Sequence, residues 1–199
     1  MLTVGVLALQ GAVQEHLDCL NALPDTQGIA VKKAAELSTV DALILPGGES
    51  TTMGKLLQEF GLAPLLADKI KSGLPVWGTC AGMILLANTI VDEPVNHLGV
   101  MDITVQRNAY GSQLNSFCTD QIVPAVSAAP VPLVFIRAPY VVKAGQEVKV
   151  LAVVGGKIVA VEENNMLATA FHPELSGCLD FHRYFVAKAK HASANKYDK

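Results

Sequence analysis

A cysteine between small residues is the feature of this sequence best suited to chemistry. The segment Gly78-Thr79-Cys80-Ala81-Gly82 has the form of a nucleophile elbow, a tight turn from a strand into a helix. Glycine-sized neighbours allow the two backbones to approach closely at such a turn. The thiol would sit at a helix N-terminus, where unpaired N–H groups favour the thiolate. We therefore predict that Cys80 is a catalytic nucleophile; the alternative is a buried structural cysteine.

A thiol nucleophile needs a base, and His172 is the histidine that follows an expected core strand. Because the carboxyl ends of parallel strands share one edge of a sheet, His172 should lie near Cys80. We expect the segment after it to be extended, so that Glu174, two residues on, faces the same way and fixes the imidazole tautomer. The remaining histidines have no partner at a useful spacing and are assigned no catalytic role: His16, His97, His182 and His191.

A glycine-rich loop, residues 45–51, follows another expected strand. Backbone N–H groups of Gly48 and Ala81 could form an oxyanion hole for acyl transfer, with Gly47 giving the loop its freedom. Glu49 would be free to bind a cation on the substrate. The alternative is a plain turn in which Ser50 or Thr51 caps the next helix.

The elements that must position these residues can be read from hydrophobic periodicity. Helical spacing of apolar residues occurs at 13–20, 53–60, 81–87 and 178–190, and the apolar strands are expected at 2–9, 29–33, 42–45, 75–79 and 166–171. Between residues 100 and 162, strands at 100–106, 116–123, 133–137, 148–154 and 157–162 leave no room for helices, and Gly155-Gly156 reads as a two-residue hairpin.

This alternation predicts an α/β fold of one domain, residues 1–199. Its central sheet is mainly parallel, with helices on both faces and an antiparallel extension. The length agrees with one domain, since about 150 residues per domain is typical. The polar residues 191–199 are expected to form a frayed tail.

Composition excludes several classes of function. With 51% hydrophobic and 17% charged residues the chain is too apolar to be disordered. The net charge of −3 and the absence of a basic run longer than Lys32-Lys33 argue against nucleic-acid binding. No apolar run reaches the length of a membrane span and no charged signal region precedes the first strand, so we expect a cytoplasmic protein.

The cysteines indicate a reducing compartment. Four are scattered without a Cys-x-x-Cys pair, which argues against both a disulfide framework and a zinc ribbon. Cys19, Cys118 and Cys178 are given no function. Neither a metal nor a cofactor is expected.

These segments together resemble the class I, triad-type glutamine amidotransferases, and in detail the glutaminase subunits of pyridoxal 5′-phosphate synthases. The resemblance runs in register from residue 1 to about residue 190. Besides the elbow and the glycine loop, it rests on the segments 5–16, 106–111, 135–139 and 171–175, which read GVLALQGAVQEH, QRNAYG, FIRAP and FHPEL.

The resemblance implies a three-layer, flavodoxin-like fold and a triad of Cys80, His172 and Glu174. It also implies a glutamine site that includes Gly47, Gly48, Glu49, Arg107, Ile136 and Arg137. An arginine can grip the α-carboxylate of L-glutamine and a carboxylate can pair with its α-ammonium. The implied activity is glutamine hydrolysis to glutamate and ammonia, which passes to a separate (β/α)₈-barrel synthase subunit that builds pyridoxal 5′-phosphate.

Two alternatives remain open on the sequence. The same triad could serve a free-standing γ-glutamyl hydrolase or a cysteine peptidase-like enzyme, which would cleave its substrate unaided. The fold could also belong to a non-catalytic regulatory subunit, although all three triad positions and both arginines are present.

Overall fold

The structure is a computed structural model that describes residues 1–107 and 116–197. A ten-stranded sheet has the order β2-β1-β3-β4-β12-β11-β9-β6-β5, with β10 paired to β11. Its strands are β1 Leu2–Leu7, β2 Thr26–Val31, β3 Ala42–Leu45, β4 Val76–Thr79, β5 Ala87–Ile90, β6 Met101–Gln106, β9 Tyr140–Ala144, β10 Lys149–Val154, β11 Lys157–Glu163 and β12 Met166–Thr169. A separate antiparallel pair contains β7 Phe117–Val123 and β8 Ser127–Phe135.

The half of the sheet from β2 to β12 is parallel. Every residue of β3, β4 and β12 is buried, as expected for strands covered on both faces. Beyond β12 the neighbours β11, β9 and β6 run antiparallel, and β5 returns parallel to β6. Gly155 and Gly156 have φ values of 57° and 76° and join paired strands, so the predicted hairpin is confirmed.

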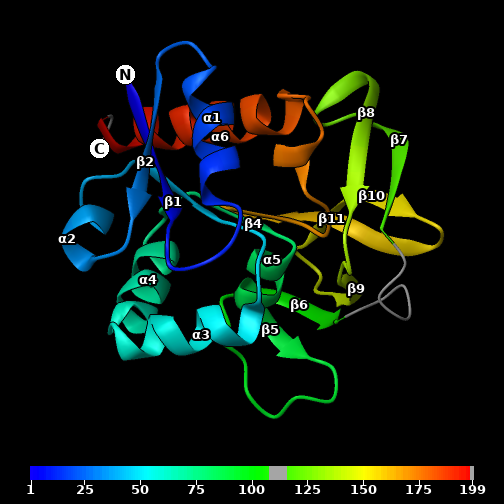
Figure 1. The fold of residues 1–199 in the computed structure, drawn as a ribbon, viewed down its shortest axis with the longest axis horizontal. Helices are drawn as coiled ribbons and strands as arrows, with labels where there is room; N and C mark the ends of the chain where they lie inside the picture. The colour runs from blue at the N-terminus through cyan, green and yellow to red at the C-terminus, as the bar shows by residue number, and fades with distance from the viewer. Residues whose placement is uncertain (108–115, 198–199) are drawn as a thin grey trace.

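Helices cover both faces of the sheet, and α1 and α6 lie on the face opposite to α3, α4 and α5 (Figure 1). The bounds are α1 Val13–Asn21, α2 Ala34–Leu37, α3 Ser50–Glu59, α4 Leu62–Lys71, α5 Ala81–Leu86 and α6 Asp180–Tyr197, with a 3₁₀ turn η1 at Pro173–Leu175. All six residues of α5 are buried, in agreement with the central helix expected there. The predicted α/β fold class, with its mainly parallel sheet and antiparallel part, is confirmed.

Some elements differ from the prediction. The sequence analysis missed α2, α4, β5 and β9, of which three are only four or five residues long and so carry little periodicity. The last helix is longer than expected, because α6 continues to Tyr197 without a glycine or proline to stop it. The fraying of residues 191–199 stays a prediction. Part of the 106–111 segment, residues 108–111, lies outside the described residues. The single-domain assignment stays a prediction.

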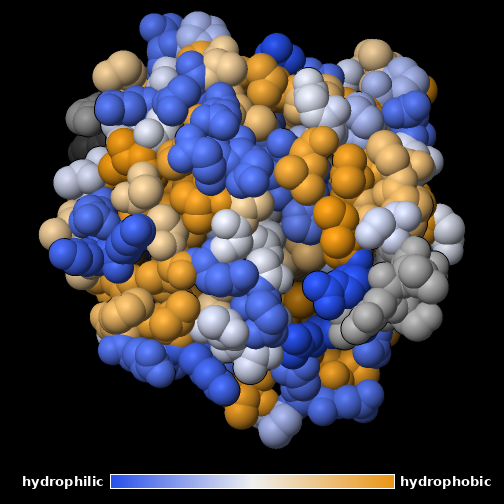
Figure 2. Space-filling model, viewed as in Figure 1, coloured by the Kyte–Doolittle hydropathy of each residue, from blue (hydrophilic) through white to orange (hydrophobic). Residues whose placement is uncertain are grey.

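The surface carries no extended apolar face in the view of Figure 2, where hydrophilic and hydrophobic residues are interspersed in small groups. Within the described ranges, no helix is both long enough and apolar enough to cross a membrane. Large apolar side chains instead fill the interior, including Trp77, Phe135, Phe171 and Phe185, none of them measurably exposed.

Candidate active site

The nucleophile elbow has the backbone that its sequence predicts. Cys80 stands between β4 and α5 with φ 47° and ψ −101°, a strained conformation for a residue with a side chain. A Cβ atom at Gly78 would lie 2.5 Å from the carbonyl carbon of Gly82, and one at Gly82 would lie 2.0 Å from the carbonyl oxygen of Leu45. Both positions therefore require glycine, because larger residues would force β3, β4 and α5 apart.

The predicted base and its orienting carboxylate are in contact. His172 Nδ1 lies 2.7 Å from Glu174 Oε1, and both side chains are largely buried. The extended segment expected between them is wrong, because Pro173 begins the 3₁₀ turn η1. Proline suits the first position of such a turn, where its missing N–H is not needed. The turn brings the carboxylate back to the imidazole.

The electrostatics of His172 favour its charged form. Burial alone would lower the pKa of the imidazole, but hydrogen bonding with Cys80 and Glu174, together with their negative charges, raises it to about 10. An imidazolium next to Cys80 stabilises a thiolate, as in other cysteine–histidine pairs. The site is thus arranged for nucleophilic attack by sulfur.

Glu49 is more engaged than the sequence suggests. Its carboxylate caps α3, accepting hydrogen bonds from the backbone N–H of Thr51 at 3.0 Å and of Thr52 at 2.7 Å. Burial opposes its ionisation, but these bonds prevail and lower the pKa of Glu49 to about 2. The helix cap is therefore neither Ser50 nor Thr51. Nor is Glu49 free, because its Oε1 also lies 3.3 Å from an Arg107 guanidinium nitrogen.

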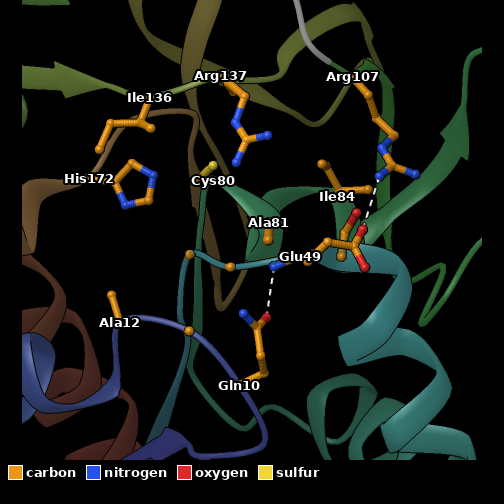
Figure 3. A pocket seen from close by; sticks show the side chains of 14 residues that line it. Gln10, Ala12, Glu49, Cys80, Ala81, Ile84, Arg107, Ile136, Arg137 and His172 are labelled. Atoms are coloured by element: carbon orange, nitrogen blue, oxygen red, sulfur yellow. Dashed lines mark hydrogen bonds and ion pairs between the residues drawn. The ribbon is translucent and has the colours of Figure 1, made fainter. Parts of the chain in front are cut away.

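The glycine loop is held by the loop after β1. The carbonyl oxygen of Gly47 accepts a hydrogen bond of 3.0 Å from the backbone N–H of Ala12. The Glu49 N–H donates to Gln10 Oε1 at 2.7 Å, as the lower dashed line in Figure 3 shows. In a trans peptide the N–H points opposite to the C=O, so the N–H of Gly48 points away from Ala12.

Fourteen residues from the loops, the strand ends and the elbow line one pocket. The pocket has a volume of about 460 Å³, which is within the range of small-molecule sites. Its lining residues are Gln10, Gly11, Ala12, Gly47, Gly48, Glu49, Ser50, Cys80, Ala81, Ile84, Arg107, Ile136, Arg137 and His172. Every predicted site residue except Glu174 is in this set. Glu174 lies behind His172, as an orienting residue should.

Sequence reasoning missed Gln10, Gly11, Ala12, Ser50 and Ile84. The first three follow the carboxyl end of β1, so the rule that located His172 could have found them as well. Ile84 carries no such signal, because it reads as one more apolar residue of the central helix.

The two predicted arginines occupy different environments. Arg107 is paired with Glu93 at 2.7 Å and with Glu49 at 3.3 Å. Arg137 has φ 45°, and its guanidinium points toward Cys80 in Figure 3. Across residues 1–107 and 116–197, no group of three or more His, Cys, Asp or Glu side chains is placed to hold a metal ion.

Fold and site together define a class I glutamine amidotransferase-like protein, in which a mainly parallel sheet carries a cysteine elbow opposite a His–Glu pair. The model of the SNO glutamine amidotransferase family matches residues 6–191. The chain therefore belongs to the SNO glutamine amidotransferase family.

Similar proteins agree with this membership. The chain is 54% identical over 186 residues to "Pyridoxal 5'-phosphate synthase subunit PdxT" of Ruminiclostridium cellulolyticum, covering 94% of this chain and 98% of that protein. It is 53% identical to the protein of the same name from Caldanaerobacter subterraneus subsp. tengcongensis, with 92% and 97% covered. A solved glutamine amidotransferase superposes with a TM-score of 0.88 at 43% identity, covering 94% of this chain and 98% of that chain.

Proposed function

We propose that this protein is the glutaminase subunit of a pyridoxal 5′-phosphate synthase, hydrolysing L-glutamine to L-glutamate and ammonia. The observation that carries the proposal is the Cys80 elbow beside the His172–Glu174 pair, at a pocket that Glu49, Arg107 and Arg137 also line. Membership of the SNO family and relatives named as synthase subunits support it.

The proposed reaction begins when the Cys80 thiolate attacks the side-chain amide carbon of glutamine. The oxyanion would accept hydrogen bonds from the N–H groups of Gly48 and Ala81. Ala81 is the first residue of α5, where backbone N–H groups have no acceptor within the helix. His172 gives its proton to the departing ammonia, and water then hydrolyses the thioester to release glutamate.

The zwitterionic head of glutamine matches the charges at the other end of the pocket. The Glu49 carboxylate would pair with the α-ammonium, and Arg107 would pair with the α-carboxylate. Glu49 and Arg107 lie 3.3 Å apart in the structure, so the bound substrate would separate them. Arg137, whose side chain points toward Cys80, supplies a second cation for the substrate, and Ile136 contributes an apolar wall.

The proposed partner is a (β/α)₈-barrel synthase subunit that receives the ammonia in the cytoplasm. The test is glutamate release from glutamine, measured for the purified chain with and without that synthase. Activity with the synthase and intact-mass labelling of Cys80 by a glutamine-mimicking diazoketone would support the proposal. Efficient cleavage of γ-glutamyl peptides by the chain alone would favour the hydrolase alternative, and no labelling would favour a non-catalytic subunit.

A further inference from the structure

Two buried histidines behind the triad have no part in the proposed reaction. His16 on α1 and His182 on α6 are fully buried, and His16 Nδ1 lies 3.0 Å from His182 Nε2. The other ring nitrogen of His16, Nε2, lies 3.2 Å from Thr79 Oγ1 and 3.4 Å from Glu174 Oε2. A line of polar side chains thus runs from α6 through α1 to Glu174. From the sequence we assigned neither histidine a partner, and the tertiary structure corrects this.

The second oxygen of Glu174 needs such a neighbour. Oε1 is engaged by His172, whereas Oε2 is buried and makes no hydrogen bond with the residues that the structure describes. An ionised carboxylate oxygen in that position is costly unless a donor faces it. The contact at 3.4 Å places the Nε2 atom of His16 against that oxygen.

Burial favours the neutral forms of both histidines. The pKa of His16 is held well below its ordinary value by burial, and further by the charges of His182 and His172. Burial lowers the pKa of His182 to about 4. A neutral imidazole has one N–H donor and one acceptor nitrogen. The tautomer of one ring therefore determines the tautomer of the other, and two orders of donor and acceptor are possible.

One order fits the surroundings. If His16 carries its proton on Nε2, that N–H faces Glu174 and Thr79, and Nδ1 accepts from the Nε2–H of His182. His182 Nδ1 is then an unprotonated nitrogen, and it is the atom of that ring found buried without a partner. The reverse order would turn a lone pair of His16 toward the carboxylate and bury an unpaired N–H on His182. Buried N–H groups without a partner are rare because they forfeit a hydrogen bond.

We propose that His16, held in the Nε2–H tautomer by His182, is a positioning residue for Glu174 and, through it, for His172. The proposal rests on the glutaminase function proposed above. The Nε2–H dipole of His16 stabilises the Glu174 carboxylate at Oε2, which leaves Oε1 in place for the His172 ring. Cys19 of α1 also interacts with Glu174, because its pKa is raised by burial and then by the Glu174 charge.

A purely structural role makes different predictions. Trp77 packs edge-on against both rings, with centroids 5.8 Å from His16 and 5.0 Å from His182, so the histidines also fill space in the core. Loss of packing lowers the melting temperature but does not move the pH dependence of catalysis. The pH profile therefore separates the two roles.

The experiment measures glutamate release from glutamine between pH 5 and 9 by the complex with its synthase. His16→Leu is expected to lower kcat about 10-fold or more while KM stays within about twofold, because His16 is not a pocket residue. The acidic limb of the kcat profile should move to higher pH, since a carboxylate without its donor binds a proton more readily. His182→Leu should shift the limb in the same direction by less.

Two matched variants complete the set. His16→Gln keeps an N–H donor near the Nε2 position and should return the acidic limb toward that of wild type. Phe181→Leu removes buried volume beside His182 from the same helix, where Phe181 stacks on Trp77. It should lower the melting temperature and leave the pH profile unchanged. An unchanged kcat and pH profile in His16→Leu overturns the proposal.

A second measurement keeps the proposal testable if His16→Leu does not fold. Nitrogen-15 NMR of the labelled wild-type chain should show both His16 and His182 as Nε2–H tautomers at pH 7. The Nδ1–H tautomer at His16 overturns the proposal whatever the variants do. A wild-type complex that releases no glutamate contradicts the proposed function instead, and the tautomers can still be read.

Discussion

The backbone N–H of Cys80 donates a hydrogen bond of 2.8 Å to the carbonyl oxygen of Thr169. Thr169 is the last residue of β12, three positions before His172, and it pairs with Thr79 of β4. The proposed nucleophile and the proposed base are therefore held near each other by adjacent parallel strands that end together. A rigid frame of this kind holds the reacting groups without mobile loops.

Removing triad side chains should produce a graded loss of activity. Cys80→Ala is expected to lower glutamate release by more than about 10³-fold, because the covalent route is lost. His172→Asn should be nearly as severe. Glu174→Gln should lose less than either, since a neutral amide can still accept from the imidazole. Steady-state glutamate release measures the loss of activity, and thermal melting checks that each variant folds. The orienting role is wrong if Glu174→Gln is the most damaging change.

The charge of His172 should depend on Cys80. The imidazole stays protonated below its pKa of about 10 and loses its proton as the pH rises through that value. In Cys80→Ala the hydrogen bond and the charge of the sulfur are gone, so the pKa should fall. NMR titration of the His172 ring in both proteins tests this, with Glu174→Gln as a second variant that should also lower the pKa. Equal pKa values in wild type and Cys80→Ala would show that the thiol does not interact with the base.

Gly47 should be intolerant of any side chain. A Cβ atom there would lie 2.3 Å from Cε1 of His172, so Gly47→Ala must displace the ring. A shift of about 1 Å in a reacting group can cost about 10²-fold in rate. Gly48→Ala is the comparison, because its Cβ would lie 2.5 Å from Gln10 Oε1, the end of a side chain that can move, and 3.1 Å from the Cα atom of Gly11. Gly47→Ala should therefore lose more kcat than Gly48→Ala, and the reverse order would argue against crowding of the base.

Glu49 should contribute to both substrate recognition and helix stability. Glu49→Gln is expected to reduce kcat/KM for glutamine by roughly 30-fold, the equivalent of about 2 kcal/mol for a truncated charge pair. An analogue without the α-amino group should be affected much less. The weakened cap of α3 should cost up to about 1 kcal/mol of stability. Glu59→Gln makes the same charge change at the far end of α3. It is expected to leave kcat/KM unchanged and not to lower stability, because a negative charge near a helix C-terminus does not stabilise the helix. Equal losses for both substrates would refute pairing with the ammonium.

Both arginines should act mainly on KM. Arg137→Ala removes a guanidinium that points into the pocket, and Arg107→Ala removes one already paired with Glu93 and Glu49. Each change is expected to raise KM for glutamine at least about 10-fold, with a smaller effect on kcat. Arg183→Ala, on the exposed surface of α6, is the matched control. Unchanged KM in both pocket variants would leave the arginines without a role in binding.

The sequence by itself determined the fold class and predicted Cys80 as the nucleophile. The elbow is a local pattern, since Gly78 and Gly82 are needed wherever a strand and a helix cross so closely. The core strands are also local patterns, because an apolar run indicates a buried strand whichever strands lie beside it. It also placed His172 correctly, because strand ends in a parallel sheet share an edge. Short elements such as α2 and β9 were missed because, unlike the apolar runs of equally short core strands, their four or five residues mix polar and apolar types without a clear period.

Only the tertiary structure decided the polar contacts of Glu49, His16 and His182. Glu49 becomes a cap paired with Arg107 because β6 brings residue 107 beside the start of α3, 58 positions away in the chain. His16 and His182, 166 positions apart, form a hydrogen bond because α1 and α6 cover the same face of the sheet. Such contacts depend on how helices and strands pack together, and the local sequence around each residue does not indicate this packing.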